Sequence, residues 1–154
     1  MTTTALVWFK RDLRVADHAP LAEAARFERA AGLFVVEPAW LASPEFDPQH
    51  AEFVLRALAE LRAALAARGM PLLVRVGEAA QVMAALRREL RVAHLLSHEE
   101  TGPAWTWARD RAVAAWCQAH GVAWREWAQT GVVRRLRSRD GWAGRWQRAM
   151  DAPR

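Results

Sequence analysis

The chain alternates short, uninterrupted apolar runs with longer amphipathic stretches. Each run spans only four to six residues and is dominated by aliphatic and aromatic side chains. Runs of this kind are too brief for helices and are typical of strands buried on both faces. They cover residues 6–9, 33–36, 72–76, 92–96 and 122–127, and we therefore predict five strands.

Apolar residues at helical spacing separate these runs. The spacing is clearest over residues 54–65, before Gly69 and Pro71 end the pattern. Further helices are predicted over residues 20–31 with Asp17 as the cap, over 82–90, and from Pro103 to a stop at Gly121. Residues 38–48 lack the spacing, so we predict a loop long enough to serve a site or an interface.

The alternation of strand and helix predicts an α/β domain. Its sheet should be parallel, with right-handed crossovers and helices on both faces. Open sheets of this type bind ligands beyond the carboxyl ends of their strands. Two polar loops follow predicted strands, over residues 10–17 and 97–102, and we expect them to contribute to a site.

Length and composition suit one globular domain, since the chain has 154 residues of which 53% are hydrophobic. Cys117 is the single cysteine, which excludes an intrachain disulfide and a multi-cysteine metal site and favours a reducing compartment. The amino terminus has no charged leader, and no apolar run approaches the ~20 residues of a membrane span. We therefore expect a cytoplasmic protein with no membrane partner.

The net charge of +5 is concentrated at one end of the chain. Residues 1–128 carry 15 basic and 15 acidic side chains, whereas residues 129–154 carry seven arginines against two aspartates. A basic tail can bind nucleic acid, but it can also be a solvated connection to a further domain. The tail also holds apolar residues, among them Trp142 and Trp146, without a core-sized face. We expect a domain over residues 1–128, followed by the start of an interdomain linker.

Several catalytic and cofactor motifs are absent from the sequence. It has no Gly-x-Gly-x-x-Gly after the first strand, no Walker A loop and no Gly-x-Ser-x-Gly elbow. Cys117 lies within a predicted helix, where a buried hydrophobe is a better interpretation than a nucleophile. His94 and His98 share one strand face, which allows a metal, but a core histidine followed by a loop histidine is the better interpretation. We expect no metal site.

The nine tryptophans and the paired glutamates have structural as well as functional interpretations. We expect one group of tryptophans to contribute core area, namely Trp8, Trp105, Trp116 and Trp124. A second group falls outside the predicted core and suits contact with a ligand or another domain, namely Trp40, Trp107, Trp142 and Trp146. Glu99 and Glu100 can accept hydrogen bonds from a ligand or pair with Arg109 or Arg111.

Five motifs taken together resemble the DNA photolyase and cryptochrome family. The opening, Leu-Val-Trp-Phe-Lys-Arg-Asp-Leu-Arg-Val-Ala-Asp-His-Ala-Pro-Leu at residues 6–21, is similar to the start of that family's chains. Glu-Pro-x-Trp from Glu37 is similar to the end of its second strand, and the segment 69–78 is similar to its third strand. His-Glu-Glu-Thr-Gly at 98–102 with Trp105 and Arg109-Asp110, and Gln-x-Gly-Val-x-Arg-x-Leu at 129–136 with Gly141-Trp142, resemble a bacterial branch.

The resemblance implies a Rossmann-like three-layer α/β/α domain with a five-stranded parallel sheet in the order 3-2-1-4-5. In the family this amino-terminal domain shelters an antenna chromophore of folate, deazaflavin or flavin type. A carboxyl-terminal helical domain binds FAD, docks on damaged DNA and splits pyrimidine dimers with light. Nothing in this chain resembles that second domain. We therefore expect a photolyase, a carbon-carbon lyase, as the full-length protein, with no catalytic residue in this chain and no activity for the chain alone.

The same resemblance assigns an antenna crevice to the loops after the first and fourth strands. Lys10 and Arg11 would meet the charge of an anionic heteroaromatic ligand, and Trp40 would stack on its ring. Glu99 and Glu100 would accept hydrogen bonds from ring N–H groups. The expected cofactor-binding set is Phe9, Lys10, Arg11, Asp12, Glu37, Trp40, His50, Glu99 and Glu100. Asp12 has a structural interpretation as well, as the partner of Arg14 or the cap of the turn.

The sequence alone leaves two points of the function undetermined, the type of antenna and the class of protein. The family tends to carry Arg or Asn where this chain has Gln49-His50, so the type of antenna is undetermined. A signalling cryptochrome would share this domain, and a stand-alone nucleotide-binding α/β module would share its fold.

Overall fold

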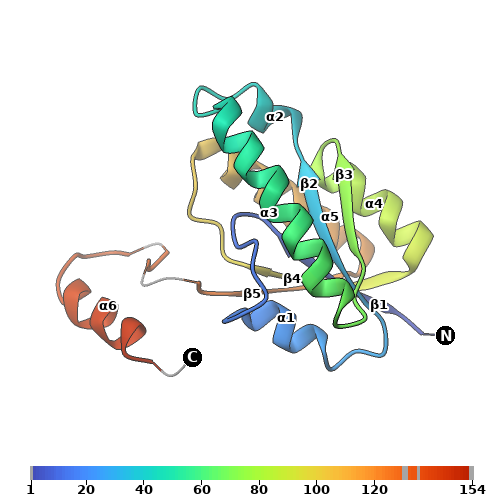
Figure 1. The fold of residues 1–154 in the computed structure, drawn as a ribbon. Helices are drawn as coiled ribbons and strands as arrows, with labels where there is room; N and C mark the ends of the chain where they lie inside the picture. Colours follow the sequence, from blue (N-terminus) through green and yellow to red (C-terminus); the bar gives the residue numbers. More distant parts are fainter. Residues whose placement is uncertain (1, 130–131, 135, 153–154) are drawn as a thin grey trace.

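A five-stranded parallel sheet forms the centre of the molecule. The computed structural model describes residues 2–129, 132–134 and 136–152. The strands lie in the order β3-β2-β1-β4-β5 (Figure 1). They are β1 (Thr4–Phe9), β2 (Ala30–Val36), β3 (Leu72–Val76), β4 (Val92–His98) and β5 (Ala123–Trp127). Every neighbouring pair is parallel, which confirms the predicted fold class and strand order.

Helices cover both faces of this sheet. On one face, α4 (Ala79–Leu90) and α5 (Ala104–His120) pack against β1 and β2 through residues such as Met83 and Val113. On the other face, α1 (Ala19–Ala24) and α3 (Pro48–Ala66) pack through Ala24, Leu61 and Leu65. The molecule therefore has three layers with a hydrophobic core on each side of the sheet (Figure 1).

Strand β1 contributes to both cores because it is buried along its whole length. Leu6 and Trp8 belong to the core beneath α4 and α5, whereas Val7 and Phe9 belong to the core beneath α1 and α3. This alternation follows from the two-residue period of a strand. It explains why the run reads as continuously apolar in the sequence and why the polar residues begin only after Phe9.

The connection between β1 and β2 differs from the prediction. Helix α1 ends at Ala24, and Ala31 lies in β2 rather than in the helix, so the predicted helix over residues 20–31 is too long. Alanine suits helices and buried strands alike, and here the pairing of Ala5 with Ala30 extends the sheet instead. Asp17 has φ 49° and does not cap α1. His18 does so, because its Nδ1 accepts the N–H of Leu21.

Two helices occur where none was predicted. The expected loop 38–48 contains α2 (Pro38–Leu41), which Pro38 opens. Residues 142–150 form α6 (Trp142–Met150), which has no buried residue and stands apart from the sheet (Figure 1). The motif at 129–136 includes residues 130, 131 and 135, which lie outside the described residues. Among the helices of the described residues, none is both long and apolar enough to cross a membrane.

Candidate functional site

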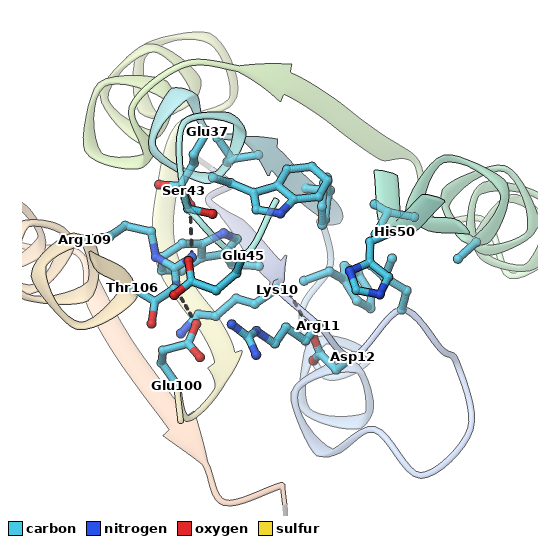
Figure 2. A pocket seen from close by; sticks show the side chains of 18 of the residues that line it. Lys10, Arg11, Asp12, Glu37, Ser43, Glu45, His50, Glu100, Thr106 and Arg109 are labelled. Carbon is cyan, nitrogen blue, oxygen red and sulfur yellow. Dashed lines mark hydrogen bonds and ion pairs between the residues drawn. The ribbon is translucent and has the colours of Figure 1, made fainter. Parts of the chain in front are cut away.

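A cavity of about 710 Å³ opens at the carboxyl ends of β1 and β2. It is bounded by the loop after β1, by α2 and the segment that follows it, by the first turns of α3 and by the first turns of α5. Its lining combines aromatic and charged side chains, including Trp8, Phe34, Trp40, Trp105, Glu37, Glu45 and Arg109. Figure 2 shows Glu37, Glu45, Glu100 and Arg109 gathered on one side, with His50 on the other. The position agrees with the expectation for an open α/β sheet.

Arg109 organises the charged side of this cavity. Its Nη1 donates to Glu37 Oε2 at 3.0 Å, its Nη2 to Glu100 Oε2 at 2.5 Å, and its Nε to Asp110 Oδ1 at 2.9 Å. The side chains of Glu37 and Glu100 are only 5% and 3% exposed. One buried guanidinium therefore joins the end of β2, the loop after β4 and the start of α5 (Figure 2).

Burial and Arg109 act against each other in setting the charge of these carboxyls. Burial raises the pKa of Glu37, and the nearby Arg109 guanidinium only partly offsets it. Burial would also raise the pKa of Glu100, but Arg109 and the backbone N–H of Gly102 outweigh it, so that pKa lies below its usual value. The pKa of Arg109 is raised, because its three carboxylate neighbours outweigh its own desolvation. Of the two glutamates, Glu37 is the more easily protonated.

Gly102 allows the loop after β4 to close tightly around Glu100. Glu100 Oε1 accepts the N–H groups of Thr101 at 2.9 Å and Gly102 at 2.7 Å. A Cβ at position 102 would lie 2.8 Å from that oxygen and 2.6 Å from Arg11 Nη2. The absence of a side chain at Gly102 thus lets Arg11 and Glu100 approach the same point from two loops.

Lys10 is part of the buried floor rather than a free cation at the cavity mouth. Its Nζ donates to Asp110 Oδ2 at 2.9 Å and to the carbonyl oxygen of His98 at 3.1 Å. It also lies 4.5 Å from the ring centroid of Trp8, within range of a cation–π contact. Arg11 is exposed, so of this basic pair it is the one available to an incoming ligand.

Two polar atoms at the cavity have no partner among the described residues. Ser43 lines the cavity, and its buried Oγ makes no hydrogen bond there. Glu37 pairs with Arg109 through Oε2 alone, which leaves Oε1 unused by the described side chains. Ser43 Oγ is buried, and buried polar groups are normally satisfied, so it fits a ligand that supplies a donor. Glu37 Oε1 is not among the sealed atoms and offers a second acceptor. Trp40 adds an aromatic surface and is braced edge-on by Phe46, with ring centroids 5.7 Å apart.

Eight of the nine residues expected from the sequence line this cavity, and Glu99 does not. Glu99 lines a smaller hollow of about 90 Å³ beside it, together with Lys10, Asp12, His98 and Gln129. The prediction did not include Trp105, Thr106 or Arg109 in the site. The sequence feature that could have identified them is the spacing on α5, since Trp105 and Arg109 lie four positions apart on one helix face.

The structural interpretations of Asp12 and His98 hold only in part. Asp12 was expected to pair with Arg14 or to cap the turn, and its Oδ1 does accept the N–H of Lys10 at 2.8 Å. It does not pair with Arg14: its Oδ2 contacts His18 and His98, while Arg14 donates to the carbonyl oxygens of Ala16 and Asp17. His98 is the buried histidine at the end of β4, whereas His94 is half-buried against Phe27. The histidine expected in the core, His94, is therefore only half-buried, and the one expected in the loop, His98, is buried in the sheet, because β4 continues two residues past the apolar run.

A model of the family described as DNA photolyase matches residues 5–140. The chain belongs to the DNA photolyase family. The match spans the sheet and both cavities, and it extends past β5. It confirms the resemblance found in the five sequence motifs.

Curated relatives of this photolyase-family domain include cryptochromes and photolyases. A cryptochrome DASH of Natronomonas pharaonis is 38% identical over 136 residues, which are 82% of this chain and 28% of the relative. A deoxyribodipyrimidine photo-lyase of Escherichia coli is 41% identical over 75 residues, which are 47% of this chain and 16% of the relative. The chain thus spans less than a third of the length of either relative.

Solved structures of the family have the same fold. A bacterial class III photolyase from Agrobacterium tumefaciens superposes with a TM-score of 0.79 at 22% identity, covering 92% of this chain and 29% of that one. An archaeal photolyase from Sulfolobus tokodaii, described with two FAD molecules, gives a TM-score of 0.76 at 20% identity, covering 98% of this chain and 35% of that one.

Proposed function

We propose that this domain shelters a light-harvesting chromophore in the large cavity and works with a carboxyl-terminal FAD domain. The observation that carries the proposal is the cavity of about 710 Å³, which combines an aromatic surface with unused hydrogen-bonding atoms at the carboxyl edge of the sheet. Ligand pockets of several hundred Å³ with a few convergent polar groups accommodate molecules of cofactor size.

The residues present fit a planar heteroaromatic ligand. Trp40 and Trp105 offer ring faces, and Ser43 Oγ and Glu37 Oε1 can accept its N–H groups. Arg11 and His50 also line the cavity, where Arg11 would meet an anionic portion of the ligand. A bound antenna of folate, deazaflavin or flavin type would absorb light and pass the energy to FAD. The photolyase from Sulfolobus tokodaii, with its two FAD molecules and the novel light-harvesting cofactor that they imply, supports the flavin type.

The full-length protein is proposed to be a deoxyribodipyrimidine photolyase that repairs pyrimidine dimers in DNA. The photo-lyase of Escherichia coli among its relatives supports this activity. Damaged DNA and FAD would bind the carboxyl-terminal domain, so the 154-residue chain alone should be inactive. We place the protein in the cytoplasm, without a membrane partner.

The exposed face of α6 suits contact with that FAD domain. Trp142, Trp146 and Met150 recur every four residues, which puts them on one side of the helix, and each is more than 40% exposed. An apolar helix face of this kind needs a covering surface. We therefore propose that α6 packs on the carboxyl-terminal domain.

A signalling cryptochrome is the second candidate. The relatives named cryptochrome DASH favour it, since two of them are 38% identical to this chain. Such a protein would use flavin photoreduction to change partners instead of splitting dimers. The antenna cavity would have the same role in both.

The experiment that separates these functions is blue-light repair of an oligonucleotide with a single pyrimidine dimer. We expect the full-length protein to contain flavin and to restore the intact sequence, and the isolated chain to leave the dimer intact. A flavin-containing protein that leaves the dimer intact would support the cryptochrome. A full-length protein without flavin would contradict both functions.

A further inference from the structure

Arg134 anchors the segment after β5 to the body of the domain. Its Nη1 and Nη2 donate to Glu126 Oε2 and Oε1 at 3.1 and 3.4 Å, and its Nε donates to the carbonyl oxygen of Glu100 at 3.0 Å. Its guanidinium carbon lies 4.9 Å from the ring centroid of Trp107, within range of a cation–π contact. The side chain thus joins three elements: β5, the loop after β4 and α5.

These contacts use the shape of the guanidinium as well as its charge. Two of its nitrogens meet the two carboxylate oxygens of Glu126, and the third donates to a backbone oxygen. A planar guanidinium holds several donors in a fixed arrangement, whereas the ammonium of a lysine is a point charge on a flexible stem. The contacts of Arg134 therefore require arginine and not only a positive charge.

The loop after β4 meets Arg134 at two points. The carbonyl oxygen of Glu100 accepts the Arg134 Nε–H directly. Trp107, whose ring faces the guanidinium, donates its Nε1–H to the carbonyl oxygen of Gly102 at 2.9 Å. Between these points, Glu100 Oε1 accepts the N–H groups of Thr101 and Gly102. The backbone of residues 100–102 is thus held by the side chain of Glu100 from within the loop and by Arg134 and Trp107 from outside it.

Glu100 connects this arrangement to the large cavity. Its backbone oxygen accepts Arg134, whereas its side-chain Oε2 accepts Arg109 Nη2. Arg109 also pairs with Glu37, and all three of Glu37, Glu100 and Arg109 line the cavity. The side chain of Glu100 is only 3% exposed, and both of its oxygens are already bound. A shift of the Glu100 backbone must therefore move Arg109 or break one of these hydrogen bonds.

We propose that Arg134 is a positioning residue for the large cavity: it fixes the backbone of residues 100–102 and, through the side chain of Glu100, the guanidinium of Arg109. Arg134 is not among the described residues that line the cavity, yet it belongs to the sequence motif at 129–136. The segment after β5 is thereby part of the site. The effect of Arg134 on a bound chromophore rests on the function proposed above, whereas its effect on the loop and on Arg109 does not.

A surface ion pair between Arg134 and Glu126 is the main alternative. Exposed pairs of this kind contribute little to stability, and lysine would serve in them as well as arginine. Two observations favour positioning instead. The side chain of Arg134 is only 20% exposed, and its Nε–H is directed at the Glu100 backbone, while the nearest oxygen of Glu99 lies 3.8 Å from that nitrogen.

Amide hydrogen exchange, measured by NMR on the chain of residues 1–154, tests the proposal without a ligand. We expect Arg134→Met to speed exchange of the Thr101 and Gly102 N–H groups at least about tenfold, because a hydrogen bond from a charged donor is lost. Exchange in the core strands β1 and β2 should stay unchanged. Arg134→Lys should resemble Arg134→Met rather than wild type. Arg137→Met is the control, since Arg137 is exposed and forms no ion pair with any residue that the structure describes.

The Nε–H of Arg109, which donates to Asp110 Oδ1 at 2.9 Å, reports the connection to the cavity. We expect its ¹H–¹⁵N signal to shift in both Arg134 variants and to stay in place in Arg137→Met. Unchanged exchange in the loop of Arg134→Met, full rescue by lysine, or an unchanged Arg109 signal would overturn the proposal. Faster exchange throughout β1 and β2 would also overturn it, because it would show a general loss of stability. No chromophore is added, so these results are independent of what the cavity binds.

Discussion

Arg109 on α5 and Glu37 at the end of β2 are separated by 72 residues in sequence but joined by an ion pair of 3.0 Å. The pair closes the charged side of the cavity and adds a polar link between two elements that also share a hydrophobic core. Glu100 shares the same guanidinium, so three segments of the chain depend on one side chain. The integrity of the site therefore depends on Arg109.

Replacement of Arg109 by methionine should destabilise the fold strongly. The change leaves the buried carboxylates of Glu37 and Glu100 without their cation, whereas Asp110 keeps Lys10 at 2.9 Å. Breaking a buried pair in this way costs about 3–5 kcal/mol. Urea unfolding measures the loss. Arg111→Met is the matched control on the same helix, because Arg111 is exposed and forms no ion pair among the described residues. Equal stability of the two variants would contradict the role of Arg109.

Asp12→Asn should change the acid sensitivity of the fold. Burial alone would raise the pKa of Asp12, but contacts with His18 and His98 and the backbone N–H of Lys10 hold it far below its usual value. The stabilisation from a lowered carboxyl pKa is complete above the unfolded pKa of about 3.9 and is lost as the pH falls below it. The difference in unfolding free energy between wild type and variant should therefore narrow below about pH 4. A constant difference from pH 5 to pH 2.5 would contradict the lowered pKa.

Cys117 should be unreactive in the folded chain. Its thiol is buried in the core beneath α5, and burial raises its pKa to about 11. Because the thiolate is the reacting form, a disulfide reagent at pH 8 should modify it only after denaturant is added. Rapid modification of the native chain would show that this core opens readily or that the thiol is accessible.

Gly32→Ala tests the packing of β2 against its neighbours. A Cβ at this position would lie 3.0 Å from Leu72, 3.1 Å from Phe9 and 3.2 Å from Leu65, so the core must shift to receive it. Overpacking of this kind costs about 1–3 kcal/mol. Gly144→Ala in α6 is the control, since its nearest neighbour would lie 3.6 Å away and alanine favours helix. A neutral Gly32→Ala would mean that β2 and α3 separate easily.

The strands could be predicted because a continuous apolar run has few other interpretations. The run from Leu6 to Phe9 is buried on both faces, as its composition requires. The boundary between α1 and β2 could not be predicted, because the alanines at positions 30 and 31 suit a helix as well as a strand until the sheet pairs them with β1. Sequence pattern decides an element where the side chains have a strong preference, and tertiary pairing decides it elsewhere.

The sequence predicts at which edge of the sheet the candidate site lies, but not which of its side chains contact one another. Loops after parallel strands share one edge, which is why Arg11 and Glu100 were expected near each other. Glu100 lines both cavities and Glu99 only the smaller one, and no spacing rule tells which of the two meets Arg109. The pairing of Asp12 with His98 spans 86 residues and depends on the register of β1 with β4.

The most direct test of the antenna proposal is to fill the cavity and measure what the full-length protein binds. Ala57 lines the cavity on α3, whereas Ala59 on the same helix is exposed and does not. The small molecules released from wild type, Ala57→Trp and Ala59→Trp by heat would be quantified by absorbance and fluorescence. We predict flavin from the FAD domain in all three, and a second chromophore in wild type and Ala59→Trp but not in Ala57→Trp. A second chromophore retained at the wild-type ratio in Ala57→Trp, or absent from wild type, would contradict the proposal.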